Sequence, residues 1–131
     1  MARSSYEEFQ QQYEDDAGRE FAALSALPVA KLLDRVRAGK FGDFYHQLWP
    51  AIASKATLAE AGWVLFDVLE SKADYLHRYH CAAALIKLAG TPLAAMTPVM
   101  LSVEKAPTTK ENLETVRNVL TQLIGPQPPR R

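Results

Sequence analysis

Three residues near the middle of the chain have the types and the spacing of metal ligands. His77, His80 and Cys81 stand at positions i, i+3 and i+4, so one helical surface would bring them together, and zinc accepts both imidazole and thiolate. A structural zinc site needs four ligands, and the remaining histidine, His46, would have to reach them by folding. The spacing therefore favours two histidines at a solvent edge beside a small buried thiol. We expect no metal and no other cofactor, and His77, His80 and Cys81 are the residues of a metal-binding alternative.

Cys81 could also serve as a nucleophile, with His77 one helical turn away as the activating base. The alanine-rich helix around this thiol offers no oxyanion donors, because the N–H groups of a helix interior are already hydrogen-bonded. An isolated cysteine in an apolar helix usually serves packing. We therefore assign no catalytic residue. A thiol enzyme is an alternative, which a slow rate of alkylation of Cys81 would exclude.

A basic group lies at Lys31, Arg35, Arg37 and Lys40. These cations could contact the phosphates of a nucleic acid, but they lack interleaved aromatic residues and a helix-turn-helix signature. A charged outer helix face is the simpler interpretation. Nucleic-acid binding by a helical-repeat protein through residues 31–40 is the alternative function.

The composition limits the class of protein. The 131 residues suit one domain, and 48% apolar with 23% charged residues is ordinary for a globular chain. Lys and Arg equal Asp and Glu at 15 each, so binding to nucleic acid or an anionic membrane has no support from net charge. No apolar run is long enough to span a bilayer, the N-terminus lacks an apolar signal core, and the single cysteine fits a reducing compartment. We expect a cytoplasmic protein with no membrane partner.

A helical hairpin is predicted to carry the histidines and the cysteine. Thr57 and Glu60 form an S/T-x-x-E capping box that begins a first helix. Ser71 then serves as the N-cap of a second helix starting at Lys72, which ends at Gly90. The expected buried stripe of the second helix is Tyr75, Tyr79, Ala82, Ile86 and Ala89.

The rest of the chain also has helical periodicity. Residues 4–24 carry the stripe Tyr6, Phe9, Tyr13, Ala17, Phe21 and Leu24, in one helix that continues past Gly18. This helix is acidic, with Glu7, Glu8, Glu14, Asp15, Asp16 and Glu20. Further helices are expected at 28–39, from Asp43 with a kink or restart at Pro50, in a short turn at Thr91–Pro92, at 98–106, and from Thr108 to Gly125.

The hairpin resembles the HEAT repeat. Its Leu69-Glu70-Ser71 leads into Asp74 and Arg78, and an alanine-rich run ends in leucine before Gly90, as in the second helix of that family. His77 departs from the family, which usually has valine there. The resemblance covers residues 64–90 and implies stacked helical hairpins that present a recognition surface, with no catalytic residues.

The sequence predicts an all-α fold of about seven helices, arranged as stacked antiparallel hairpins in a HEAT-like solenoid or as an irregular bundle. A single domain would span 1–126, and 127–131 would be a disordered tail. We expect a protein–protein interaction module without catalytic activity, and size and fold analogy alone suggest a bacterial immunity or antitoxin-like inhibitor. Its expected partner surface is the polar edge His77, Arg78, His80 and Lys87, and the acidic first helix is a second surface, suited to a basic partner such as a nuclease.

Overall fold

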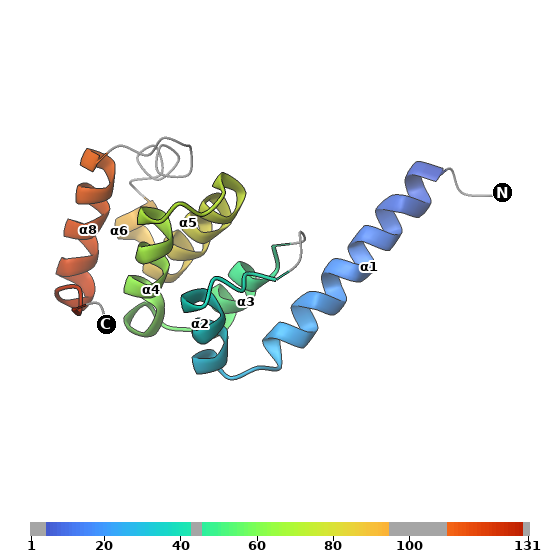
Figure 1. Cartoon of the computed structure of the whole chain (residues 1–131), viewed down its shortest axis with the longest axis horizontal. Coiled ribbons are helices and arrows are strands. Elements are labelled where there is room, and N and C mark those ends of the chain that lie inside the picture. The colour runs from blue at the N-terminus through green and yellow to red at the C-terminus, as the bar shows by residue number, and fades with distance from the viewer. Residues whose placement is uncertain (1–4, 43–45, 95–109, 130–131) are drawn as a thin grey trace.

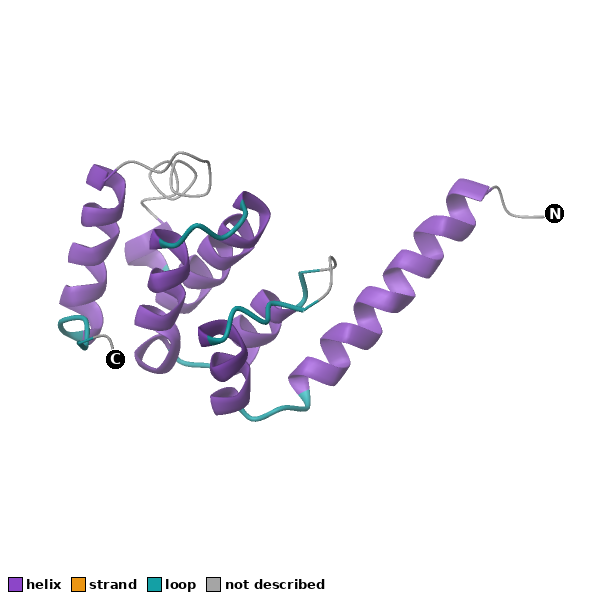
Figure 2. Ribbon diagram, viewed as in Figure 1, coloured by secondary structure: helices purple, strands orange, loops and turns teal. Residues whose placement is uncertain are grey.

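The computed structural model describes residues 5–42, 46–94 and 110–129, and within these ranges it is all-α, with seven helices and no strand (Figure 2). The helices are α1 (Ser5–Ser25), α2 (Val29–Arg37), α3 (Leu48–Lys55), α4 (Leu58–Glu70), α5 (Tyr75–Ala89), α6 (Thr91–Ala94) and α8 (Lys110–Ile124). The predicted all-α class is confirmed. None of the described helices is both long and apolar enough to cross a lipid bilayer.

The helices that follow α1 in the chain pack in two layers (Figure 1). In one layer α4 lies between α2 and α8, and in the other α5 lies between α3 and α6. The largest contact between the layers joins α4 to α5, which a short connection links in sequence. Helix α1 packs on α3 at its C-terminal end and projects away from α4 and α8 (Figure 1).

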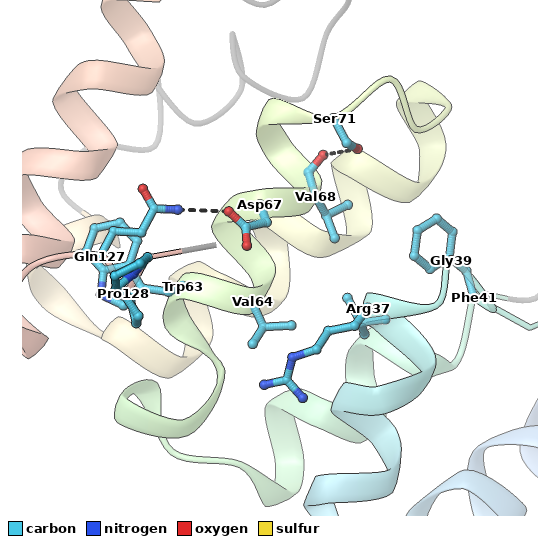
Figure 3. Close-up of a pocket in the computed structure, with 12 residues that line it drawn as sticks. Arg37, Gly39, Phe41, Trp63, Val64, Asp67, Val68, Ser71, Gln127 and Pro128 are labelled. Carbon is cyan, nitrogen blue, oxygen red and sulfur yellow. Dashed lines mark hydrogen bonds between the residues drawn. The ribbon is translucent and has the colours of Figure 1, made fainter. Parts of the chain in front are cut away.

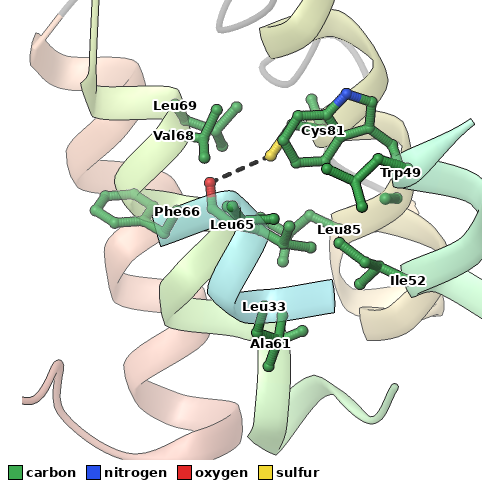
Figure 4. Close-up of a cluster of buried hydrophobic side chains, with 14 of the residues drawn as sticks. Leu33, Trp49, Ile52, Ala61, Leu65, Phe66, Val68, Leu69, Cys81 and Leu85 are labelled. Carbon is green, nitrogen blue, oxygen red and sulfur yellow. Dashed lines mark hydrogen bonds between the residues drawn. The ribbon is translucent and has the colours of Figure 1, made fainter. Parts of the chain in front are cut away.

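Helix α4 is the centre of the core. Thr57 accepts a hydrogen bond from the backbone of Glu60, and the Glu60 carboxylate accepts one from the backbone of Thr57, which confirms the predicted capping box. Most of the helix beyond this cap is buried (Figure 4). Trp49 and Ile52 from α3 and Leu85 from α5 complete the same cluster.

The predicted start of α5 is wrong by three residues. The hydroxyl of Ser71 donates to the carbonyl of Val68 at 2.7 Å and accepts from the backbone of Ala73, so Ser71 closes α4 instead of opening α5. Asp74 is the N-cap, and its carboxylate accepts from the backbone of Leu76 at 2.8 Å. Two capping residues three positions apart compete here, and the serine is taken by the preceding helix.

The predicted buried stripe of α5 is also wrong in part. Tyr75 and Tyr79 are 55% and 44% exposed, whereas Arg78, Cys81 and Leu85 are buried. A helix that is apolar on nearly every side does not fix its inward face by periodicity. Arg78 is accommodated because its Nε donates to the carbonyl of Ala73 at 3.0 Å.

Pro50 neither kinks nor interrupts a longer helix, because α3 begins at Leu48 and the proline lies in its first turn, where a missing N–H removes no helical hydrogen bond. The expected start at Asp43 lies outside the described residues. The predicted helix 98–106 and the predicted cap at Thr108 lie outside them too.

The segment after α8 contacts α4. The Gln127 amide donates to the carboxylate of Asp67 at 2.8 Å, across 60 positions of sequence. The indole of Trp63 donates to the carbonyl of Gly125, which takes a positive φ of 84° at the end of α8. Residues 125–129 therefore return over α4, and the disordered tail 127–131 stays a prediction.

We expect the Leu65→Ala substitution to lower the free energy of unfolding by about 2–5 kcal/mol, because Leu65 is fully buried in α4 and its loss would leave a cavity in the core. Leu123→Ala is the matched control, since Leu123 is 41% exposed, and we expect a change of about 0.5 kcal/mol or less. Urea unfolding followed by circular dichroism measures both. Equal effects of the two substitutions would contradict the placement of α4 at the centre of the core.

Candidate functional site

Folding brings the three histidines together beside α5. The ring centroid of His46, from the segment before α3, lies 4.8 Å from that of His77 and 4.7 Å from that of His80. His46 reaches this position with a left-handed backbone, at a φ of 59°. Phe41 covers the group from one side, with its ring centroid 4.7 Å from that of His77. The sequence placed only His77 and His80 on one surface, and the third member depends on the path of the chain into α3.

The histidine cluster, which we define as His46, His77 and His80, is not arranged as a metal site. The indole N–H of Trp49 donates to Nδ1 of His77 at 3.3 Å, so the proton of the neutral His77 ring stands on Nε2 and neither nitrogen is offered to a metal. Within the described ranges no three His, Cys, Asp or Glu side chains are grouped as metal ligands. The candidate ligands His77, His80 and Cys81 of the metal-binding alternative do not converge on one point, because Cys81 faces the core.

The environment of the cluster disfavours protonation. Burial, followed by repulsion from His46, lowers the pKa of His77 below the ordinary value of 6.5, while Asp74 acts weakly in the opposite direction. Burial, followed by repulsion from His46 and His77, lowers the pKa of His80 as well. The folded protein therefore prefers these two rings neutral.

Cys81 is fully buried between α5 and α4, and its thiol donates to the carbonyl of Leu65 at 3.3 Å (Figure 4). Burial raises the pKa of this thiol well above its ordinary value. The thiolate, which is the nucleophilic form, is strongly disfavoured at this position. The geometry supports the packing role that we predicted and speaks against a thiol nucleophile.

The residues of the predicted partner surface on α5 differ in exposure. Lys87 is exposed, and His77 and His80 are half exposed, in contact with His46. Arg78 is buried at 7% exposure, so it is unavailable to a partner. The surface stays a prediction for His77, His80 and Lys87, without Arg78.

The basic residues of the nucleic-acid alternative do not all lie on one exposed surface. Lys31, Arg37 and Lys40 are exposed, but Arg35 lines a hollow between α1 and α2 together with Asp16 and Glu20. Carboxylates beside this guanidinium would repel a phosphate. The structure leaves α2 with a mixed electrostatic surface and not a purely basic one.

The most unusual exposed surface lies on α1, where sequence reasoning expected an ordinary stripe. Tyr6, Phe9 and Tyr13, which we call the aromatic stripe, are 72%, 69% and 39% exposed. Every residue from Ser5 to Asp15 is exposed, and Leu24 is the one fully buried residue of the helix. The signal that could have identified this end as uncovered was its acidity, because carboxylates flank the aromatic rings on the helical wheel.

A groove of about 820 Å³ lies between α2, α4 and the C-terminal segment (Figure 3). Phe41, Trp63, Val64 and Val68 give it apolar walls, and the Arg37 side chain extends from α2 toward α4. Its size is within the range of roughly 300–1,000 Å³ that is usual for binding pockets. This α2–α4 groove is larger than the hollow between α1 and α2.

Comparisons with protein-family models, curated proteins and solved structures found no match to this chain. The resemblance of the α4–α5 hairpin to a HEAT repeat therefore stays a prediction. The function has to be argued from the surfaces themselves.

We predict that acid destabilises the protein through the histidine cluster. A group whose pKa is lower in the folded than in the unfolded chain adds stability above its unfolded pKa, and this stability is lost as the pH falls below about 6.5. The urea midpoint should be constant at neutral pH and should decrease as the pH falls below about 6.5.

The control for this prediction is His46→Asn, which removes the charge facing His77 and His80 and suits a left-handed backbone. We expect a shallower dependence of the midpoint on pH in this variant. If the urea midpoint of the unsubstituted protein stays constant or rises on acidification, the histidine cluster does not destabilise the protein in acid.

We also predict that the native Cys81 thiol resists alkylation at neutral pH and reacts at the rate of a free thiol only after unfolding in urea. The measurement is the time course of iodoacetamide labelling by mass spectrometry. Rapid labelling of the native protein would revive the thiol-enzyme alternative.

Proposed function

We propose that this protein is a protein-binding module and that the aromatic stripe of α1 is its contact surface. The observation that carries the proposal is the exposure of Tyr6 and Phe9, 72% and 69%, on a helix that projects from the body (Figure 1). Aromatic side chains dominate the energetics of protein interfaces. Adjacent exposed aromatic residues on one helical face are typical of a binding site, whereas isolated ones are ordinary.

The energetic argument concerns the helix as well as its rings. Full burial of one Phe-sized side chain stabilises by about 1.5–3 kcal/mol, so covering Phe9 and its neighbours is a substantial favourable term. In the first three turns of α1 the side-chain hydrogen bond from Gln11 to Asp15 is local to the helix. A partner would supply the tertiary packing on which helices in water depend.

The charges beside the stripe define the class of partner. Glu7 and Glu14 lie on one flank of the rings, and Asp16 lies on the other. A positively charged protein surface with an apolar centre complements this pattern, whereas nucleic acid is repelled by it. An inhibitor that neutralises a basic protein, as immunity proteins and antitoxins do, belongs to this class. The acidic residues beside the aromatic stripe support that version of the proposal.

The test is site-specific photo-crosslinking in the source cell. A benzoylphenylalanine introduced at Phe9 should form a covalent adduct with a defined protein, because the ring lies in the proposed contact. The matched control places the same group at Gln11, on the opposite side of α1, where we expect adducts to be weaker by roughly tenfold or more. If both positions give the same adducts, or neither gives any, α1 is not the contact surface.

A further inference from the structure

The chain itself carries a surface that complements the aromatic stripe. The α2–α4 groove has apolar walls, with Arg37, Asp67 and Gln127 also in its lining, and α1 of the same molecule leaves the body on the side away from α4 and cannot cover it without abandoning α3 (Figure 1). One molecule thus presents an exposed aromatic ridge and a groove with apolar walls at separate places. Each is the kind of surface that the other would cover.

The dimensions of ridge and groove agree. The groove is lined by Trp63, Val64, Asp67 and Val68 of α4 and by its C-cap Ser71, so the first and last of these residues are eight steps apart along one side of the helix. At about 1.5 Å per residue this is about 12 Å, and the aromatic stripe from Tyr6 to Tyr13 spans about 10 Å. An amphipathic helix laid into an apolar groove with anchors at i, i+3 and i+7 is a recurrent mode of protein recognition.

The charges agree as well. Helix α1 has six acidic residues and one basic residue, whereas α2 has three basic residues and one acidic residue, followed by Lys40. Arg37 and Asp67 are the charged residues that line the groove. The Asp67 carboxylate accepts a hydrogen bond from the Gln127 amide, and the Arg37 side chain is 58% exposed with a loose ion pair to Asp34 at 3.4 Å. A surface guanidinium in such a pair can turn to a second carboxylate at little cost.

We propose that the aromatic stripe of α1 binds in the α2–α4 groove of a second copy of this chain, and that the exchange is reciprocal. This inference rests on the proposed function, because it names the partner of the same helix face. In two copies related by a two-fold axis, the ridge of each copy occupies the groove of the other. No ridge or groove is then left over, so the assembly is a closed dimer. Pairing of the two stripes with each other would instead bring the acidic flanks Glu7, Glu14 and Asp16 of both helices together.

The experiment measures mass in solution by light scattering after size exclusion, across a wide range of protein concentration. We expect the original chain to have the mass of two chains. Phe9→Glu in the ridge and Val64→Glu in the groove should each weaken dimerisation by roughly tenfold or more, whereas the control Gln11→Glu, on the opposite side of α1, should leave it unchanged. Arg37→Glu is a second groove variant at an exposed position, in case Val64→Glu does not fold.

Mixing the two variants gives the decisive result. The Val64→Glu chain keeps an intact ridge and the Phe9→Glu chain keeps an intact groove, so a mixture should form mixed dimers although each variant alone is a monomer. If a dimer is lost on Phe9→Glu but survives both groove variants, the stripes pair with each other and the inference is overturned.

A chain that is monomeric at every concentration also overturns the inference, and the crosslinking result then decides the proposed function. Adducts from Phe9 with a different protein would retain the protein-binding role with another partner. The absence of any adduct specific to Phe9 would remove both proposals.

Discussion

The burial of α4 on nearly all sides is the constraint on which the rest of the structure depends. Seven of its 13 residues are buried, so helices must pack against it from several directions, and α2, α5 and α8 do so. The approach of α8 is close enough that a Cβ at Gly62 would lie 2.7 Å from Cδ1 of Ile124. The C-terminal segment extends this cover through Trp63 and Asp67. The α2–α4 groove is a side of α4 where the cover is incomplete.

Much of this helical framework could be predicted from the sequence, because helix ends are set by local chemistry. The capping box at Thr57 and the left-handed glycines Gly90 and Gly125 are examples, since each acts within one turn. The errors arose where two local signals competed or where periodicity carried too little information. Ser71 and Asp74 could both cap α5, and the choice depended on the end of α4. Nothing local separates the inward face of α5 from its flanks, because the helix is apolar on nearly every side.

The candidate surfaces could be predicted only in part, for a different physical reason. His46 joins His77 and His80 because of where the chain enters α3, which no periodicity encodes. The burial of Arg78 depends on a carbonyl acceptor from the loop before its own helix. The stripe on α1 could be recognised in the sequence. A periodic apolar pattern does not show, however, whether the residues that pack on it belong to the same chain or to another molecule. Exposure is a property of the whole fold, and only the structure separated Leu24, which is buried, from Tyr6 and Phe9, which are not.

The stability of α1 as a helix bears on what its exposed half is for. Gly18 in its interior costs about 1 kcal/mol relative to alanine. Side-chain pairs such as Gln11 with Asp15 and Gln12 with Asp16 return only about 0.2–0.5 kcal/mol each, so they do not by themselves offset the entropy of ordering eleven exposed residues. The apolar contacts of α1 with the core lie near its other end, at Phe21 and Leu24. On the proposed function, a partner surface over the first half of α1 would supply apolar packing that the core does not, so ordering of this half and binding would be coupled. A contact at Phe9 would then stabilise the helix and the complex together.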